Sequence, residues 1–219
     1  TQCRVCRTAI LTYNVISTYV NTGDTYDCRL EKRRRNAARK KVLITGASGL
    51  IGGLVIEHLR HKYVLTGLAR RPVDTIPSLQ ASITDADAIK PAFDGIHTVL
   101  HLAAATTGYT EQWEPTMAIT IQGTLNVYEA ARLAGVKRVI FMSSGCTQLG
   151  YMLDDDSPYA KLAEGHENDP EFPASWRMIT IDDPVRPDSP YAVGKLFGEN
   201  LGRMYADRHG ISTLVIRLG

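Results

Sequence analysis

The 219 residues are 44% hydrophobic and 22% charged, which is ordinary for a globular chain and enough for one domain with a substantial core. The net charge of +2 conceals an asymmetry: residues 1–41 hold ten Lys/Arg against three Asp/Glu, and the acidic remainder argues against a nucleic-acid-binding body. Four cysteines do not make a disulfide framework, and no apolar run approaches the roughly 18 residues of a membrane span, so we expect a cytoplasmic protein without a membrane partner.

Residues 1–39 are predicted to be a basic, poorly ordered extension. Cys3 and Cys6 have the spacing of a zinc half-site, but too few further ligands lie nearby to complete it, so we expect no metal site. An arm that binds nucleic acid or another partner is the functional alternative for this charge run. Because the chain begins at Thr1 and ends at Gly219 directly after an apolar run, we expect it to be a fragment at both ends.

Residues 41–53 are predicted to form a buried strand, a glycine turn and the start of a helix. The apolar residues 42–44 suit a central parallel strand, and the apolar residues after the turn recur at helical spacing. Gly46 permits the tight turn, Gly49 lets the backbone approach a pyrophosphate, and Gly52 lets the helix pack closely on the strand. The cofactor-binding residues predicted in this stretch are Gly46, Ser48, Gly49, Leu50, Ile51 and Gly52.

A second strand is predicted at residues 63–68, and it ends at Ala69, Arg70 and Arg71. A carboxylate at this position would bind the ribose 2′-OH of NAD, whereas an arginine accommodates the 2′-phosphate of NADP. Because Ala69 stands where the carboxylate would be expected and two arginines follow it, NADP is the favoured cofactor and NAD the alternative. Both arginines could instead be solvated side chains without a ligand.

A third strand is predicted within residues 76–83 and a fourth at residues 96–102, with a short helix between them. The fourth strand runs into small residues that would let a cofactor lie against the backbone. His101 lies within this buried strand and is expected to be a core residue rather than a catalytic one. The predicted cofactor contacts here are Leu102, Ala103 and Ala104.

An amphipathic helix is predicted over residues 113–134. Its expected packing residues include Met117, Ile121, Leu125, Val127 and Tyr128. A fifth strand at residues 136–142 follows it and delivers Ser143 and Ser144 at its carboxyl end. In an open parallel sheet, ligands bind at that edge.

Residues 145–189 form an unusually long connection and are predicted to be a loop that acts as an acidic lid or a binding loop. Its carboxylates are too irregularly spaced to indicate a metal site. Trp176 and Arg177 are candidate substrate contacts. A helix at residues 190–209 follows, and then a sixth strand at residues 213–218.

Tyr191 and Lys195 are four residues apart in this helix, so both side chains project from one face. A free tyrosine is a poor base at neutral pH, but a neighbouring ammonium favours its phenolate. Tyr191 could then exchange a proton with a substrate hydroxyl or carbonyl while a nicotinamide exchanges a hydride. Ser144 would hydrogen-bond the same oxygen. An ordinary pair on a helix surface is the alternative.

Five motifs occur in one order: G-x-x-G-x-x-G at 46–52, H-L-A-A at 101–104, G-T-L-N-V at 123–127, S-S at 143–144 and Y-x-x-x-K at 191–195. Together they make residues 40–219 resemble the extended short-chain dehydrogenase/reductase family, and more narrowly its NAD-dependent epimerase/dehydratase group. The resemblance implies that Ser144, Tyr191 and Lys195 are catalytic and that Lys195 also binds the nicotinamide ribose. The segment around Ser144 is similar to that of uronate dehydrogenases.

Several positions depart from the family pattern. Thr120 stands where many relatives have an asparagine that helps to organise a proton relay, and Ser82 stands where an aspartate often contacts adenine. A register taken from Gly150 would put Gly145 in the place of the catalytic serine, but glycine has no hydroxyl, so we keep Ser144. The same segment lacks the Asp-Glu pair that sugar-nucleotide 4,6-dehydratases use to eliminate water, which disfavours that reaction.

The expected fold is therefore α/β, a doubly wound parallel sheet of the Rossmann type over residues 40–219, with the family's C-terminal substrate-binding part largely missing. The expected function is that of an NAD(P)-dependent oxidoreductase or epimerase acting on a secondary alcohol or carbonyl of a sugar or sugar derivative. A non-catalytic dinucleotide-binding regulatory module is the alternative. The resemblance is also compatible with a homodimer.

Overall fold

The structure is a computed structural model that describes residues 39–105, 112–154, 157–165 and 178–219, together with residues 168, 170 and 172. Residues 38–178 and 184–219 form one compact unit, to which the following description applies. The predicted N-terminal extension up to residue 38 and the candidate contacts Trp176 and Arg177 lie outside the described residues.

Among the described residues, six parallel strands form one sheet in the order β3-β2-β1-β4-β5-β6. The strands are β1 (Lys41–Thr45), β2 (Val64–Ala69), β3 (Ser78–Gln80), β4 (Thr98–His101), β5 (Arg138–Ser144) and β6 (Ser212–Leu218). The strand order reverses between β1 and β4, and sheets of this kind bind ligands in the crevice beyond that switch point. The predicted doubly wound parallel sheet is confirmed.

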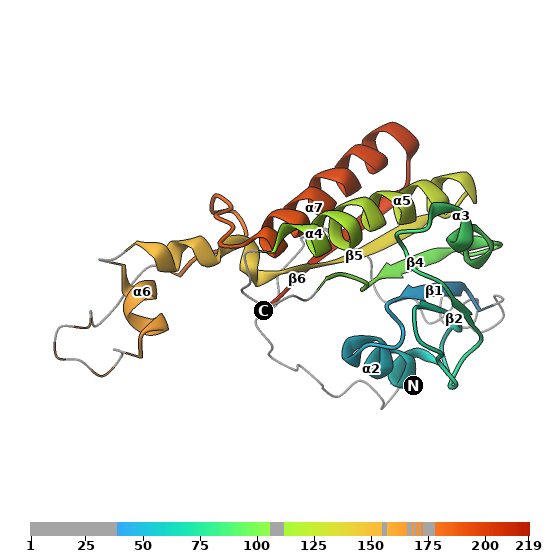
Figure 1. Ribbon diagram of the computed structural model, residues 1–219, viewed down its shortest axis with the longest axis horizontal. Coiled ribbons are helices and arrows are strands. Elements are labelled where there is room, and N and C mark those ends of the chain that lie inside the picture. Colours follow the sequence, from blue (N-terminus) through green and yellow to red (C-terminus); the bar gives the residue numbers. More distant parts are fainter. Residues whose placement is uncertain are drawn as a thin grey trace, which may run out of the picture. The chain divides into compact units, whose positions relative to one another are not determined.

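Helices cover both faces of this sheet. Figure 1 shows α3, α5 and α7 on one face and α2 on the other. The helical elements are α2 (Leu50–Leu59), α3 (Ala86–Ile89), η1 (Lys90–Phe93), α4 (Trp113–Pro115), η2 (Thr116–Gln122), α5 (Gly123–Leu133), η3 (Gly145–Leu153), α6 (Pro158–Ala163) and α7 (Pro190–His209).

The sheet has an apolar core on each face because alternate residues of a strand point to opposite sides. In β1, Leu43 packs into the larger core beneath α5 and α7, whereas Val42 and Ile44 pack into the smaller core beside α2. A strand that is buried on both faces reads as a continuous apolar run. The apolar runs of the sequence therefore reflect a sheet enclosed between two helical layers.

Local signals set the ends of several helices. The carboxylate of Asp85 accepts hydrogen bonds from the amides of Asp87 and Ala88 and caps α3, and the Ser189 hydroxyl caps α7 in the same way. Gly210 ends α7 in the left-handed conformation with φ of 66°. The predicted helix over residues 190–209 is confirmed to the residue.

The helical run after residue 112 differs from the prediction. It is α-helical only at its two ends, and the middle segment η2 is a π-helix. Met117 is 50% exposed and is not a packing residue, so that expectation is wrong. Thr116, Thr120 and Thr124 are buried instead. The methyl groups of Thr116 and Thr120 lie against Gly194 of α7, and Thr124 is hydrogen-bonded to His101 of β4.

Helix α7 packs unusually closely on its neighbours through three glycines one turn apart. A Cβ atom on Gly198 would lie 2.2 Å from the ring of Phe141 in β5. A Cβ atom on Gly194 would lie 2.9 Å from a methyl group of Thr116, and one on Gly202 would lie 2.7 Å from Thr213. Side chains at these positions would hold the helix away from β5, η2 and β6.

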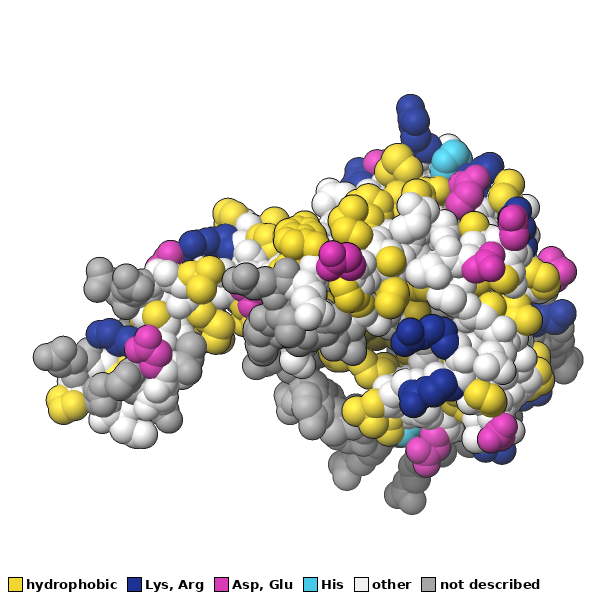
Figure 2. Space-filling model, in the orientation of Figure 1, with side chains coloured by type: hydrophobic (Ala, Val, Ile, Leu, Met, Phe, Trp, Pro, Cys, Tyr) yellow, Lys and Arg dark blue, Asp and Glu magenta, His cyan; other side chains and the backbone are white. Residues whose placement is uncertain are grey.

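Two helical elements, η3 and α6, lie within the segment that the sequence predicts as a long loop. No helix in the described part of the chain is both long enough and apolar enough to cross a membrane. On the face drawn in Figure 2, basic and acidic side chains are interspersed among apolar ones. Both signs of charge therefore occur on this face.

Candidate active site

A cleft of about 860 Å³ lies at the switch point between the strand ends of β1, β2 and β4. It brings together every predicted cofactor contact except Lys195. Those residues are Gly46, Ser48, Gly49, Leu50, Ile51, Gly52, Arg70, Arg71, Leu102, Ala103 and Ala104. Ser82, Ile83 and Ile119 also line the cleft, and of these the sequence had suggested only Ser82.

At two positions, the glycine turn lies very close to neighbouring backbone atoms. Gly46 has φ of 71°, and a Cβ atom there would lie 2.9 Å from the amide nitrogen of Ala103. A Cβ atom on Gly52 would lie 2.6 Å from the carbonyl oxygen of Gly46 and 2.7 Å from that of Ala47. All these obstacles are backbone atoms, so the turn tolerates only glycine at both positions. Helix α2 begins directly behind this turn and directs its amino-terminal amides at the cleft, where they suit a pyrophosphate.

Arg70 and Arg71 follow the end of β2 at the rim of the cleft. The Arg71 guanidinium donates a hydrogen bond of 3.1 Å to the carbonyl of Ser48, which ties it to the glycine turn. Of the described residues that line the cleft, none is Asp or Glu. The carboxylate that reads the ribose of NAD in many dinucleotide folds therefore has no counterpart among them.

The three predicted catalytic residues come from two segments that are about fifty positions apart and meet at the carboxyl end of β5. Ser144 is the last residue of β5, and its hydroxyl accepts a hydrogen bond from the Cys146 amide at the start of η3. Tyr191 and Lys195 lie in the first two turns of α7. The Ser144 hydroxyl also lies near the Tyr191 phenol and lowers its pKa. The structure thus brings the three side chains together as predicted.

Lys195 is almost completely buried, with 2% of its surface exposed. Its ammonium donates a hydrogen bond of 2.7 Å to the carbonyl of Met142 in β5. It also lies 5.2 Å from the ring centre of Phe141 and 5.4 Å from that of Tyr191. Because burial penalises the charged form, the pKa of Lys195 is lowered to about 8.

The pKa of Tyr191 is raised above its ordinary value, and this corrects the expectation that Lys195 would favour the phenolate. The main cause is burial of the phenol; an electrostatic contribution from Cys146 adds to it, and the nearby Ser144 side chain opposes it. Lys195 directs its ammonium at a backbone carbonyl instead. In this state of the site, Tyr191 is a phenol at neutral pH.

A partly buried ion pair joins α7 to β6, close to the candidate catalytic residues. The Arg217 guanidinium makes two hydrogen bonds, of 2.9 and 2.8 Å, to the carboxylate of Glu199, and both side chains are 15% exposed. Ser143, which precedes Ser144 in β5, donates a third hydrogen bond of 2.5 Å to Glu199. This carboxylate therefore connects the three elements that meet at the site. Sequence reasoning missed it because its partners are 56 and 18 positions away.

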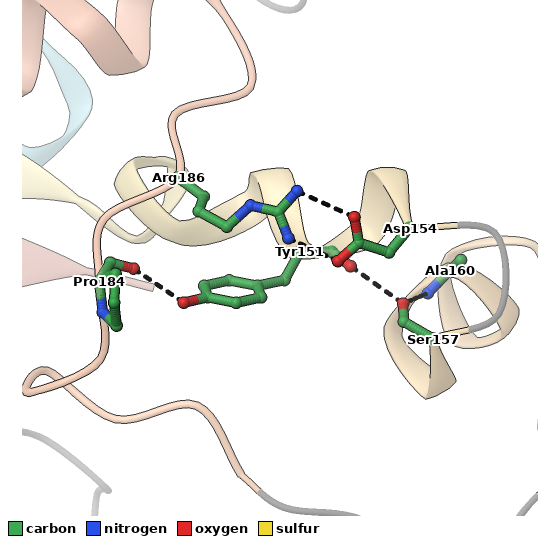
Figure 3. A network of polar contacts seen from close by, with 6 residues as sticks. All are labelled: Tyr151, Asp154, Ser157, Ala160, Pro184 and Arg186. Atoms are coloured by element: carbon green, nitrogen blue, oxygen red, sulfur yellow. Dashed lines mark hydrogen bonds and ion pairs between the residues drawn. The ribbon is translucent and has the colours of Figure 1, made fainter.

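A second polar network closes the long connection between Ser144 and Tyr191 (Figure 3). Arg186 forms a two-pronged ion pair with Asp154, at 2.5 and 2.9 Å, and its guanidinium lies 4.8 Å from the ring centre of Tyr151. The Tyr151 hydroxyl donates to the carbonyl of Pro184 at 3.0 Å. We call these four residues the clasp.

Backbone contacts reinforce the clasp. The Gly150 amide donates to the carbonyl of Arg186 at 2.7 Å, and the Arg186 amide donates to the carbonyl of Thr147 at 2.9 Å. A Cβ atom on Gly150 would lie only 2.5 Å from that Arg186 carbonyl oxygen. The two ends of the long connection are thus held side by side, near the candidate catalytic residues. The sequence carried no local signal for this pairing across more than thirty positions.

His101 is fully buried and hydrogen-bonded at both ring nitrogens, so its expected place in the core is confirmed. Across the part of the chain that the structure describes, no three His, Cys, Asp or Glu residues gather where they could hold a metal ion.

Comparison with known proteins identifies relatives of this chain. A sequence profile of the NAD dependent epimerase/dehydratase family matches residues 42–219. The L-arabinose 1-dehydrogenase (NAD(P)(+)) of Haloferax volcanii is 35% identical over 179 residues, which are 82% of this chain and 66% of that protein. The uronate dehydrogenase of Agrobacterium fabrum is 32% identical over 185 residues, or 82% of this chain and 61% of that protein.

Solved structures give the same picture. A mutant uronate dehydrogenase from Agrobacterium tumefaciens, complexed with NAD, has a TM-score of 0.61 and 31% identity, covering 80% of this chain and 59% of that one. A glucuronic acid dehydrogenase from Chromohalobacter salexigens has a TM-score of 0.66 and 27% identity, covering 83% of this chain and 61% of that one. This chain therefore spans less than two thirds of the length of these relatives.

Proposed function

Because the chain belongs to the NAD-dependent epimerase/dehydratase family, we propose that the protein is an NAD(P)-dependent dehydrogenase that oxidises a secondary hydroxyl of a sugar or sugar acid. The observation that carries this proposal is the meeting of Ser144, Tyr191 and Lys195 at the carboxyl end of β5, the edge of the sheet that also holds the glycine cleft. The dehydrogenase names of the relatives above support the choice of substrate class.

The chain's own residues would hold the reacting oxygen and move its proton. The Ser144 hydroxyl and the Tyr191 phenol lie near each other, so a substrate hydroxyl placed between them could bond to both oxygens. Tyr191 would take the hydroxyl proton as the carbon loses its hydride. Lys195, held by the Met142 carbonyl, would keep a positive charge below the tyrosine ring.

A bound oxidised nicotinamide supplies the hydride acceptor and a positive charge of its own. The raised pKa of Tyr191 implies that the phenolate needs such a charge to form near neutral pH. We therefore expect the oxidation rate to increase with pH through the pKa of Tyr191 in the loaded enzyme. The reverse reduction, which needs the phenol, should be favoured at lower pH.

We also propose NADP as the preferred cofactor. Two arginines stand at the cleft rim, none of the described cleft residues is a carboxylate, and Arg71 is already fixed to the glycine turn. A guanidinium in this place can pair with a 2′-phosphate. Tighter binding of NADH than of NADPH would count against this assignment.

The test uses the full-length gene product. Cofactor affinity is measured by the fluorescence of NADH and NADPH, and activity by nicotinamide absorbance with aldoses, uronic acids and sugar phosphates. We expect oxidation of at least one of these sugars, and Tyr191→Phe should lower kcat by about a thousandfold while leaving the Kd for the reduced cofactor within about twofold. Full activity of Tyr191→Phe would sink the catalytic assignment. Tight cofactor binding without turnover of any sugar would favour the regulatory module.

Two further assignments are proposals of the same kind. We infer a cytoplasmic location from the cysteine content, since the described body holds Cys146 as a free thiol. We infer a homodimer from the exposed apolar side chains of Leu133 on α5 and Met204 on α7. Light scattering after gel filtration would reveal the dimer, and a monomer at tens of micromolar would refute it.

A further inference from the structure

His101 is the one fully buried imidazole in the described chain, and the catalytic scheme above does not use it. It lies at the end of β4, between the glycine turn on one side and the π-helical segment η2 with α5 on the other. Each ring nitrogen has one threonine partner. The direction of these two bonds follows from the other bonds that the threonines make.

The Thr124 side fixes the proton on the ring. The Thr124 hydroxyl lies 2.5 Å from the carbonyl oxygen of Thr120, and a carbonyl can only accept, so the single hydroxyl proton is used there. Toward His101 Nε2, at 3.0 Å, the Thr124 oxygen can then only accept. Nε2 must therefore carry the ring proton.

The direction of the hydrogen bond to Thr45 follows from the charge of the His101 ring. Burial and the nearby positive charge of Lys195 lower the pKa of His101 to about 3, so the ring is neutral and its second nitrogen has no proton. Nδ1 is then an acceptor, and the Thr45 hydroxyl donates to it at 2.6 Å. The Thr45 oxygen remains free to accept the amide proton of Ala103 at 3.3 Å.

The result is a directed chain of hydrogen bonds between two functional regions. It starts at the backbone of Ala103, which lines the cofactor cleft, and passes through Thr45 to His101. It continues through Thr124 to the Thr120 carbonyl within the π-helical turn. A threonine hydroxyl that donates a hydrogen bond to a backbone carbonyl of its own helix is a known cause of such irregular turns.

Both ends of this chain of hydrogen bonds contact segments of the proposed cofactor and catalytic sites. The Thr120 hydroxyl accepts the amide of Ala105 at 3.0 Å, so the backbone on either side of Ala104 is tethered. The Thr120 methyl group also lies against Gly194 of α7, where a Cβ atom would come within 3.0 Å. Helix α7 carries the catalytic tyrosine and lysine, so the shape of the π-turn sets their distance from the cleft.

We infer that His101 is a positioning residue: as a neutral imidazole protonated on Nε2, it holds the cofactor-facing backbone through Thr45 and the π-turn beneath α7 through Thr124. This inference rests on the proposed function, because it assigns the two ends to cofactor binding and to catalysis. We call the hydrogen bond between His101 and Thr45 and the one between His101 and Thr124 the two arms. We expect that substitutions can remove one arm and leave the other in place.

Two variants each keep one arm. In His101→Asn the amide oxygen can replace Nδ1 as the acceptor for Thr45, and the Thr124 arm is lost. In His101→Gln the longer amide can replace Nε2 as the donor to Thr124, and the Thr45 arm is lost. His58→Gln, which changes an exposed histidine of α2, is the matched control. Thr45→Val and Thr124→Val remove the same arms from the other side if either His101 variant fails to fold.

We expect His101→Gln and Thr45→Val to raise the Kd for NADH about tenfold with little change in kcat at saturating cofactor. We expect His101→Asn and Thr124→Val to lower kcat about tenfold while the Kd for NADH stays within about twofold. His58→Gln should match the wild type in both. Equal losses in both parameters for all four variants, or no loss in any, would overturn the two-arm assignment.

A second readout does not depend on activity. Long-range proton–nitrogen NMR correlation should show His101 protonated on Nε2 alone between pH 5 and 8, and the Ala103 amide should exchange with solvent faster in Thr45→Val than in Thr124→Val. A proton on Nδ1, or equal exchange rates, would refute the chain of bonds. If the wild type bound no nicotinamide cofactor the proposed function would fail, but the tautomer and the exchange rates would still decide the role of His101.

Discussion

The side of the site proposed to bind the cofactor and the side proposed to be catalytic, called the cofactor side and the catalytic side, are built by different means. On the cofactor side, β1, the glycine turn and the end of β4 present backbone atoms to the cleft, and close approaches such as that of Gly46 to Ala103 are between main chains. On the catalytic side, β5 and α7 present side chains held by other side chains, such as Glu199 between Ser143 and Arg217. The first side depends on the absence of side chains, and the second on their exact partners.

This difference predicts different tolerances. A backbone obstacle cannot turn away, so a methyl group added on the cofactor side must distort the turn itself. A side-chain partner can rotate or be replaced, so a change on the catalytic side should leave the fold intact and affect the chemistry first.

Gly52→Ala should have the largest effect. Its Cβ atom would lie 2.6 Å from the Gly46 carbonyl oxygen, and we expect a loss of about 3 kcal/mol in the free energy of unfolding and at least a hundredfold rise in the Kd for NADH. The neighbouring Gly53→Ala is the control, since nothing lies within 4 Å of a Cβ atom there. It should stabilise the chain by up to about 1 kcal/mol. Urea unfolding and cofactor titration measure both, and a harmless Gly52→Ala would break the comparison.

Glu199→Gln should come next. It leaves the Arg217 guanidinium without its counter-charge in a place where both side chains are 15% exposed, and we expect a loss of about 2 kcal/mol in stability with cofactor affinity unchanged. Asp207→Asn removes the carboxylate of an exposed ion pair on the same helix, with side chains 79% and 58% exposed, and should have no measurable effect. Equal effects of the two changes on urea unfolding would contradict a buried anchor.

Lys195 gives a pH-dependent test of the catalytic side. Its pKa is lowered from 10.5 to about 8 in the folded chain, so between these values the unfolded chain binds more protons and folding becomes more favourable as pH rises. Lys195→Met lacks this titration. The stability of the wild type relative to Lys195→Met should therefore increase by about 2 kcal/mol between pH 7 and pH 10. A constant difference across this range would show that the ammonium is not buried as described.

Arg186→Ala should have the smallest effect. It opens the clasp but leaves the backbone pairing of Gly150 with residue 186 in place, so we expect kcat to fall about threefold without a change in the Kd for NADH. Lys90→Ala removes an exposed ion pair between η1 and Asp87 of α3, far from Arg186 in the sequence, and should leave kcat unchanged. A rise in the cofactor Kd for Arg186→Ala would mean that the two sides of the site are not independent.

The features of the fold and site that the sequence predicted correctly are those with local signals in the sequence. The glycine turn and the bounds of the helix at residues 190–209 are each decided by a few adjacent residues, and the structure has them where predicted. Ser189 caps this helix and Gly210 ends it. Continuous apolar runs identified the strands, and the helices between them indicated that the strands are parallel.

The parts that it could not place depend on contacts across the chain. The π-turn at Thr120 depends on a threonine bond that His101, 19 positions earlier, completes. The pKa of Tyr191 is raised mainly because the fold buries the phenol. The sequence predicted that Lys195 would favour the phenolate of Tyr191, but the Lys195 ammonium donates to the Met142 carbonyl. Spacing along a helix shows that two side chains share a face, but it does not show what else that face meets.

The three glycines of α7 have a consequence for how the protein folds. Each glycine in a helix interior lowers intrinsic helix stability by about 1 kcal/mol relative to alanine, so the isolated 20-residue segment should be largely unstructured. It becomes helical by docking on β5 and η2, where the missing side chains allow close contact. The four-residue spacing of Tyr191 and Lys195 therefore becomes a shared face only after β5 is in the sheet. Nascent chains should acquire their catalytic geometry in one late step, together with protection of the α7 amides from hydrogen exchange.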